Sequence, residues 1–383
     1  MKDLFTSFVA AALVAAAATI WSASLQAAGK HPEVVTNNDL KGSNTATFFK
    51  FTGTTLQNNG SAPTGGKGIG GGFAGLNRIV LGASGTTVCG FVGDAGSDDI
   101  AVFKEVNKVI TKVGNFKDAH GSGKAHGIGL AVTKNFLFAA YSSTKNIGVW
   151  QVLSGCKLKL SGTYKSAGVV AGMRAAPNFK TLVVSYGSGV NKVDSFSIAA
   201  NGKLTERGPY SATGSAAGVD ISADSAHAIF GDTTKSTTQV EIYPINSDGS
   251  LGKDHNFGGD GSLGSGIGSG NVWLSADEKF LFVSNNSSKQ ITSLAFVENP
   301  LSLSYINITS LNNPGNEIIS SAGINTILTG YIVVAEDGSP DSSVGLLQIN
   351  SDGSTTEVSG SPFKISPGGP GLQSVMVGPP RPF

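Results

Sequence analysis

The sequence has little charge. Asp, Glu, Lys and Arg make up 14% of its 383 residues, and 27 basic residues offset 26 acidic ones to give a net charge of +1. A nucleic-acid-binding surface needs a broad basic patch, so we expect no nucleic-acid partner. Solvated helices also need many charged residues, whereas the 53 glycines favour tight turns and closely packed sheets. The composition predicts an all-β protein.

Long apolar runs are absent except near the N-terminus. There, Lys2 precedes an Ala-rich stretch over residues 8–21, and small residues follow over 22–28. This pattern predicts a secretory signal peptide over residues 1–27, cleaved between Ser24 and Ala28. The apolar core is shorter than the roughly 20 residues of a membrane span, with an uncleaved anchor as the alternative. We therefore expect a secreted or periplasmic, cell-envelope protein with no transmembrane segment after cleavage.

One short pattern recurs along the rest of the chain. A Gly, once replaced by Asn, precedes an apolar residue and, in most copies, a polar one. The copies are Gly75-Leu76-Asn77, Gly127-Ile128-Gly129, Gly172-Met173-Arg174, Gly218-Val219-Asp220, Asn271-Val272-Trp273, Gly323-Ile324-Asn325 and Gly371-Leu372-Gln373. Their spacing of 45 to 53 residues is typical of a β-propeller, in which each unit is one four-stranded blade around a central channel.

Strand and turn patterns agree with this period. Residues 137–145 align without a gap on residues 281–289, and the hexapeptide Ile-Asn-Ser-Asp-Gly-Ser occurs at both 245–250 and 349–354. Third strands of blades are expected at residues 100–103 and 147–150. The pairs Asn201-Gly202, Asp248-Gly249 and Asp352-Gly353 predict two-residue hairpin turns with positive φ angles before the fourth strands.

The two ends of the chain supply the parts of a seventh blade. Six blades are expected to start near residues 74, 126, 171, 217, 270 and 322. Residues 34–60 match outer strands without an inner one, and residues 371–378 match an inner strand alone. Pairing them closes the ring and removes exposed strand edges. The sequence thus predicts one domain over residues 28–383, a seven-bladed propeller of four-stranded antiparallel blades whose last blade is shared by both termini.

Cysteine is scarce, with only Cys89 and Cys156 in the chain. One disulfide is possible in an oxidising compartment. The two residues fall toward the same face of adjacent blades, but we place one in an inner strand and the other in an outer turn. Because the Cα atoms of a disulfide lie within about 7 Å of each other, this placement argues against a bridge.

Three further segments link the chain to a known family. Val34-Val35-Thr36-Asn37, residues 275–285 and Gly360-Ser361-Pro362-Phe363 resemble the YVTN-repeat, lactonase-like seven-bladed propellers. That family includes 6-phosphogluconolactonases and carboxymuconate lactonising enzymes, along with secreted proteins of unknown role. The resemblance covers the whole mature chain and implies the fold, because these motifs belong to the blade scaffold and carry no chemistry.

The resemblance also implies where catalytic residues of the family's enzymes stand. An Arg-His pair begins an inner strand, and a Glu ends the second strand of the same blade. In the third blade these positions hold Val170-Ala171 and Tyr186. Glu336 occupies the acid position of the sixth blade, whose inner strand begins with Ser320-Ser321. Neither blade therefore carries the full lactonase set.

His126 is the candidate catalytic residue. It occupies the family's His position in the second blade, with Ala125 before it and Tyr141 at the acid position. His120 and His126, with Lys124 between them, also have the chemistry for metal ligation or acid-base catalysis. Their spacing fixes no third ligand, and exposed loop histidines are the simpler interpretation.

The channel mouth is where we expect a binding site. The starts of inner strands border it, so the repeat is expected to gather polar side chains there. These are Asn77, His126, Arg174, Asp220, Asn325 and Gln373. Arg174 and Asp220 belong to adjacent blades and could form a charge pair that holds a carboxylate or hydroxyl ligand. Alternatively, the six side chains simply hydrate a water-filled channel.

Two acidic hairpins and one Gly-rich run offer other sites. The hairpin acids are Asp94, Asp98 and Asp99 on one turn and Glu336, Asp337 and Asp341 on another. They follow no calcium-loop pattern, and we expect no metal and no cofactor. Gly66-Lys67-Gly68-Ile69-Gly70-Gly71 matches the dinucleotide fingerprint, but that motif needs a preceding parallel strand and a following helix. We interpret the run as a flexible connection between two blades.

The sequence supports two functions. The first is a binding or scaffold module outside the cytoplasm, which holds a small polar ligand or a protein partner at the channel mouth. The second is a lactonase or cycloisomerase acting on a sugar-derived or aromatic-derived lactone, with His126 as acid or base and Arg174 holding the substrate carboxylate. The missing Arg and Glu of the family favour the first function, and the sequence alone leaves catalysis open.

Overall fold

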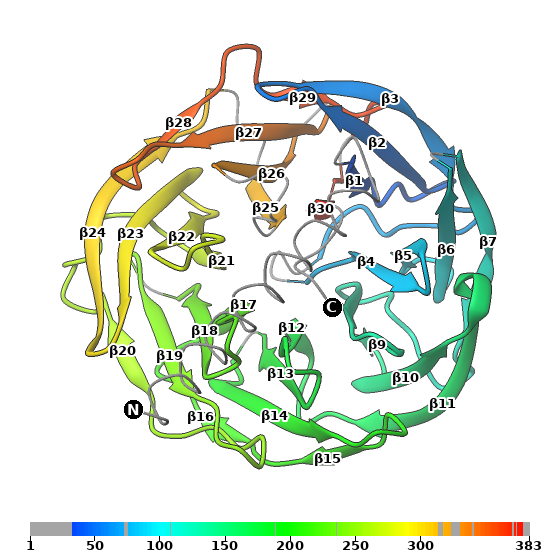
Figure 1. Cartoon of the computed structure of the whole chain (residues 1–383), viewed down its shortest axis with the longest axis horizontal. Helices are drawn as coiled ribbons and strands as arrows, with labels where there is room; N and C mark the ends of the chain where they lie inside the picture. Colours follow the sequence, from blue (N-terminus) through cyan, green and yellow to red (C-terminus); the bar gives the residue numbers. More distant parts are fainter. Residues whose placement is uncertain are drawn as a thin grey trace, which may run out of the picture.

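The protein is a ring of seven antiparallel β-sheets around a common axis (Figure 1). This computed structural model describes residues 33–72, 76–107, 109–187, 189–234, 236–312, 317–322, 330–338, 341–369, 371–372 and 374–377. The predicted all-β, seven-bladed propeller is confirmed. Within those ranges the only helical segment is the short 3-10 turn η1 (Ser154–Cys156).

Blades 1 to 3 follow each other along the chain, each built from the axis outward. Blade 1 holds β4 (Ile79–Ser84), β5 (Thr87–Asp94), β6 (Asp99–Val106) and β7 (Val109–Lys117). Blade 2 holds β8 (Ile128–Val132), β9 (Phe136–Tyr141), β10 (Asn146–Val152) and β11 (Leu158–Lys165). Blade 3 holds β12 (Val170–Ala175), β13 (Thr181–Tyr186), β14 (Lys192–Ile198), β15 (Leu204–Glu206) and the added strand β16 (Tyr210–Ser211).

Blades 4 to 6 repeat this order. Blade 4 holds β17 (Ala216–Ile221), β18 (His227–Asp232), β19 (Val240–Pro244) and β20 (His255–Phe257). Blade 5 holds β21 (Ser269–Leu274), β22 (Phe280–Asn285), β23 (Gln290–Glu298) and β24 (Leu301–Ser310). Blade 6 holds β25 (Glu317–Ala322), β26 (Tyr331–Asp337), β27 (Ser343–Ile349), β28 (Thr355–Glu357) and the added strand β29 (Phe363–Lys364).

Blade 7 joins the two ends of the chain. Its outer strands are β1 (Glu33–Asn37), β2 (Thr45–Phe51) and β3 (Leu56–Pro63), and its inner strand is β30 (Ser374–Val377). Val35 pairs with Met376, and Asn37 pairs with Ser374. The predicted closure by N-terminal and C-terminal strands is confirmed.

Hydrophobic clusters form between neighbouring blades rather than within one blade. Phe138 of β9 packs in one cluster with Leu182 and Val184 of β13. All residues of β9 and β13 are buried, whereas the outermost strand β7 keeps several exposed positions. A strand covered on both faces needs no alternation of apolar and polar residues, which explains the continuous apolar runs of the second strands.

The hairpin turns before the fourth strands differ from the predicted type. Gly202, Gly249 and Gly353 have φ angles of 82°, 85° and 85°, and among the described residues only the Gly of each predicted pair is left-handed. Gly249 N–H donates to the Asn246 carbonyl (2.9 Å), and Asn246 N–H donates to the Ser250 carbonyl (2.8 Å). This is a four-residue turn that ends on a left-handed Gly, so a two-residue turn was the wrong prediction.

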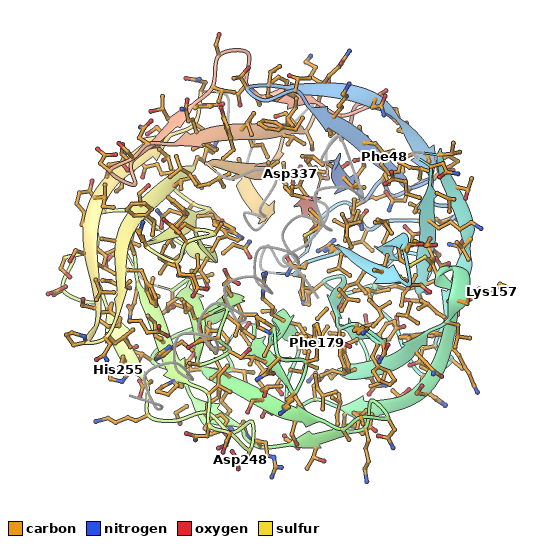
Figure 2. The ribbon with its side chains drawn as sticks, viewed as in Figure 1. Phe48, Lys157, Phe179, Asp248, His255 and Asp337 are labelled. Atoms are coloured by element: carbon orange, nitrogen blue, oxygen red, sulfur yellow. A yellow bond between two sulfur atoms is a disulfide. The ribbon has the colours of Figure 1, made fainter. Side chains whose placement is uncertain are left out.

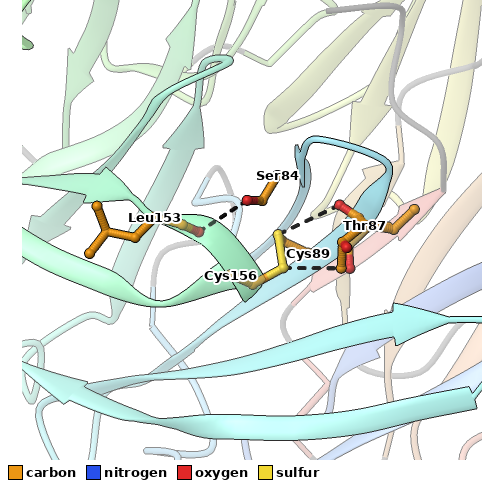
Figure 3. Close-up of a disulfide and its surroundings, with 6 residues drawn as sticks. Ser84, Thr87, Cys89, Leu153 and Cys156 are labelled. Atoms are coloured by element: carbon orange, nitrogen blue, oxygen red, sulfur yellow. Dashed lines mark hydrogen bonds between the residues drawn. A yellow bond between two sulfur atoms is a disulfide. The ribbon is translucent and has the colours of Figure 1, made fainter.

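A disulfide joins blades 1 and 2 (Figure 3). Cys89 lies on β5 and Cys156 in η1, with their Cα atoms 5.6 Å apart. The expectation against a bridge was wrong because Cys89 is on the second strand of its blade, not the inner one. Nearby, the Ser84 hydroxyl donates to the Leu153 carbonyl (3.0 Å) and adds a second link between the same blades.

The predicted signal peptide, residues 1–27, lies outside the described residues. Within the described residues, no helix has the length and apolar character needed to cross a membrane.

Candidate functional site

Close packing of the inner strands sets the channel wall. A Cβ atom on Gly172 would overlap the carbonyl oxygen of Ala217 in the next blade, and one on Gly218 would overlap Asn271. The backbones of β12, β17 and β21 therefore approach so closely that only Gly fits at these positions. This packing explains why the recurring motif contains Gly in blades 3 and 4.

The motif lies at different heights along the channel in different blades. In blade 3, Gly172 is inside β12 and pairs with Ser185. In blade 2, Gly127 precedes β8, has a φ of 121°, and leaves room for the side chain of Arg78. The inner strands of blades 3 to 6 contain a register shift near their start, whereas β4 and β8 pair regularly. The same motif thus meets two different requirements, which are close packing between inner strands in blade 3 and space for the Arg78 side chain in blade 2.

Two ends of the channel must therefore be distinguished. We call the end where inner strands begin the upper end and the end where they finish the lower end. Asn77 precedes β4 and His126 precedes β8, so both lie at the upper end. Arg174 and Asp220 are the last residues but one of β12 and β17, so they lie at the lower end. Asn325 and Gln373 lie outside the described residues.

The expected pair of Arg174 and Asp220 forms at the lower end. Arg174 Nε lies 3.0 Å from Asp220 Oδ1, and the side chains are 27% and 1% exposed. Asp220 also accepts hydrogen bonds from the backbone N–H groups of Ile221 and Leu274, each at 2.8 Å. Blades 4 and 5 thus fix the carboxylate, and the carboxylate orients the Arg of blade 3. Because the pair uses Nε, the exposed part of the guanidinium remains accessible to an anion.

A second ion pair, buried at the upper end, was not predicted. Arg78 Nη1 lies 2.8 Å from Asp39 Oδ2, and both side chains are fully buried. Arg78 Nη2 also donates to the His126 carbonyl (2.8 Å), while Nε makes no hydrogen bond to the described part of the chain. Burial raises the pKa of Asp39, and Arg78 acts in the opposite direction.

The Gly-rich run covers this buried pair. The N–H groups of Ile69 and Gly71 donate to the Asp39 carboxylate (3.1 and 3.2 Å), and Gly70 N–H donates to the Asp39 carbonyl (2.9 Å). A Cβ atom on Gly72 would overlap Arg78. The run connects β3 to β4 as predicted, but it is held by specific hydrogen bonds and packs on the ion pair.

Hydrogen bonds hold the backbones of the upper-end residues in place. His126 is half-buried, its N–H donates to Ser142 Oγ (2.9 Å), and its carbonyl accepts from Arg78. The Asn77 carbonyl accepts from Leu130 N–H (2.7 Å). Lys124, between the two loop histidines, pairs with Asp98 at 3.1 Å. A ligand-binding role for these residues stays a prediction.

The hairpin acids serve mostly as internal hydrogen-bond acceptors. Asp94 accepts from Asn44 Nδ2 (2.7 Å) and Thr64 Oγ1 (3.0 Å), and burial raises its pKa to about 7. Glu336 accepts from Ser343 Oγ (3.1 Å), and burial raises its pKa to about 8. Acids held inside a sheet in this way are poor ligands for an external cation, because they are already desolvated and partly protonated.

The third-blade positions of the family's catalytic set have structural roles. Val170 pairs with Tyr186, and the register shift follows, at Ala171. The Tyr186 hydroxyl donates to Asp194 Oδ2 (2.9 Å), so the residue at the acid position is a buried phenol. The side chain at that position is therefore a phenol and not the carboxylate of the family's enzymes.

Sequence reasoning missed Arg78 and Asp39 because they lie 39 positions apart on blades 1 and 7. The pair forms where blades 7 and 1 pack against each other. One signal was available: Arg78 stands directly before the apolar strand β4, where a cation is unexpected in a channel wall.

Comparisons with known proteins agree with the fold. The chain is similar to the periplasmic gluconolactonase of Pseudomonas aeruginosa, with a TM-score of 0.69 and 16% identity over 91% of this chain and 99% of that one. It is also similar to a Bacteroides fragilis protein with a provisional 6-phosphogluconolactonase assignment, with a TM-score of 0.70 and 16% identity over 91% and 98% of the two chains.

A protein from Lactobacillus plantarum gives a TM-score of 0.69 and 16% identity over 91% of this chain and 99% of that one. No family model and no curated protein matches the sequence. The chain therefore has the fold of the lactonase-like seven-bladed propellers, as the resemblance implied. At this level of identity the similarity concerns the fold.

Proposed function

We propose that this chain is an extracytoplasmic binding propeller that holds a small anionic ligand at the lower end of its channel, without catalysis. The observation that supports the proposal is the ion pair of Arg174 and Asp220. A buried, doubly hydrogen-bonded carboxylate orients the guanidinium of Arg174, whose side chain as a whole stays 27% exposed. An oriented Arg is suited to bidentate binding of a carboxylate or phosphate.

A sugar carboxylate is the ligand to test first. Gluconate is suitable, because structural neighbours include a periplasmic gluconolactonase and gluconate is the hydrolysis product of gluconolactone. Calorimetric titration of the Arg174→Ala variant should show at least a tenfold loss of gluconate affinity, since hydrogen bonds to charged groups contribute about 1.5–3 kcal/mol. The control is Lys203→Ala, which removes an exposed cation from the turn between β14 and β15 of the same blade.

Thermal unfolding separates the binding role from a structural one. If Arg174→Ala unfolds at a much lower temperature, the pair is structural, since Asp220 would be left buried without its partner. If gluconate and related sugar acids fail to bind the wild-type protein, or bind the variant equally well, the proposal is wrong.

The rival function is lactone hydrolysis, and the structural neighbours are the observation in its favour. Its two candidate residues lie far apart. Val170 of β12 and Ile128 of β8 each pair with the last residue of the second strand of their blade, so they lie at the same level along the channel. Arg174 lies three pairing positions further along β12, towards the lower end. Three residues of strand span about 10 Å, and His126 lies beyond the opposite end. The backbones of the two residues are therefore more than about 10 Å apart along the channel, which disfavours contact of one lactone ring with both side chains.

A direct assay tests this rival. We expect δ-gluconolactone to hydrolyse in the presence of the purified protein at its uncatalysed rate. Saturable hydrolysis that is lost in His126→Ala and kept in His120→Ala would establish the enzyme instead.

The extracytoplasmic location belongs to the same proposal. It is supported by the predicted signal peptide and by the disulfide of Cys89 and Cys156, because such bonds persist in oxidising compartments.

A further inference from the structure

A cavity separate from the channel opens among the lower-end turns of blades 2, 3 and 4. Its volume is about 540 Å³, and its lining includes Lys134, Phe136, Phe179, Lys180, Arg207 and Asp248. Figure 2 shows Asp248 at the outer rim of the ring and Phe179 nearer the axis. The size is that of a small-molecule site, which commonly encloses 300–1,000 Å³.

The lining is positively charged. Lys134 comes from the turn between β8 and β9, Lys180 from the turn between β12 and β13, and Arg207 from the segment after β15. Asp248 is the single acid among the lining residues. Three cations from three separate turns in a chain of net charge +1 form a local concentration of positive charge that suits an anion.

The Arg207 side chain is oriented by its surroundings. Its Nε donates to Ser197 Oγ (3.2 Å), and its backbone is tied by Arg207 N–H to the Ser195 carbonyl (2.8 Å) and by the Tyr210 hydroxyl to the Arg207 carbonyl (2.6 Å). The Asp248 carboxylate is occupied by Ser250, through its N–H (3.0 Å) and hydroxyl (2.6 Å). Among the described residues no carboxylate forms an ion pair with the guanidinium within 4.0 Å, although Asp248 is close enough to interact with it electrostatically.

Two aromatic rings supply the apolar part of the cavity. Phe136 is 9% exposed and starts β9. Phe179 is half-buried in a turn and has a φ of 60°. The corresponding turns of blades 4 and 5 place Ser225 (φ 65°) and Glu278 (φ 56°) in the same left-handed conformation. A bulky aromatic residue is disfavoured there, so its presence in blade 3 indicates a local requirement for the ring.

The turn that carries Phe179 is well ordered by hydrogen bonds. Phe179 N–H donates to the Ala176 carbonyl (2.8 Å), and Asn178 N–H donates to Ser225 Oγ in blade 4 (3.0 Å). Lys180 N–H donates to Asn178 Oδ1 (2.9 Å). The backbone that carries Phe179 and Lys180 thus keeps its position without a ligand, which lowers the entropy cost of binding one.

We propose that this cavity is a second binding site, for a small ring compound that carries a phosphate or carboxylate group. The anionic group binds Arg207, Lys134 and Lys180, and the ring packs on Phe179 and Phe136. The site is independent of Arg174, which does not line the cavity.

Phenyl phosphate is the probe, titrated by calorimetry or NMR alongside inorganic phosphate and benzyl alcohol. We expect phenyl phosphate to bind at least tenfold more tightly than either fragment, and its affinity to fall with added salt. Arg207→Ala should weaken phenyl phosphate binding at least tenfold. Phe179→Ala should remove the preference for phenyl phosphate over inorganic phosphate.

Matched variants distinguish binding in this cavity from binding elsewhere on the protein. Lys203→Ala removes a nearby exposed cation outside the lining and should leave the affinity unchanged, as should Arg174→Ala. Arg207 is exposed, so its loss should not change the unfolding temperature. The proposal is wrong if phenyl phosphate does not bind, if it binds no better than inorganic phosphate, or if Arg207→Ala and Lys203→Ala have equal effects.

Discussion

At the residue scale, burial decides what a charged side chain can do. Arg78 and Arg174 both pair with an Asp of a neighbouring blade, but Arg78 is fully buried and Arg174 keeps 27% of its surface exposed. The first pair therefore holds the upper end of the channel together, and the second still offers nitrogen donors to a ligand. The sequence predicted the Arg174 pair from the repeat, whereas burial of Arg78 could not be inferred from its neighbours in the chain.

Glu336 provides a prediction for pH dependence. Burial first, and then repulsion by Glu357, raise its pKa from 4.5 to about 8 in the folded protein. Between these values the folded state binds more protons than the unfolded state, so the stability falls as the pH rises. Glu336→Gln removes this effect. Urea unfolding at pH 5 and pH 9 should show wild type losing more stability than the variant, by on the order of a few kcal/mol. Equal losses in the two proteins would refute the assignment.

At the element scale, the strands could be predicted but their exact register could not. The alignment of residues 137–145 with 281–289 matches β9 and β22, which end at Tyr141 and Asn285 with the same hairpin length. The inner strands were harder, because blades 3 to 6 carry an extra residue near the strand start. Such a bulge depends on the pairing partner, so the motif alone did not fix the level of each polar residue along the channel.

The inner-strand glycines allow a test of blade packing. Gly172→Ala places a methyl group against the Ala217 carbonyl of the next blade and the Ser185 hydroxyl. We expect a loss of about 1–3 kcal/mol in the free energy of unfolding, as for other overpacked sites. Gly42→Ala is the control, because no atom lies within 4 Å of its Cβ position, and it should change stability by less than about 0.5 kcal/mol. Similar values for the two variants, from denaturant unfolding, would contradict the packing.

At the scale of the whole molecule, the ring depends on contacts between distant parts of the chain. Asn37 Nδ2 donates to the Gly93 carbonyl (2.9 Å), and Arg78 N–H donates to Ser374 Oγ (3.2 Å), so blade 7 is bonded to blade 1. The Asp39–Arg78 pair joins the same two blades. The sequence predicted the closure itself, because each terminal segment lacked the strands that the other supplied.

Removal of the closing strand tests the central claim most directly. Deleting residues 371–383 takes away β30, leaves β1 as an open edge and removes the Ser374 contact to Arg78. The account predicts that the truncated protein loses the single cooperative unfolding transition of the full chain, monitored by circular dichroism during heating. An unchanged melting transition in the truncated protein would contradict it.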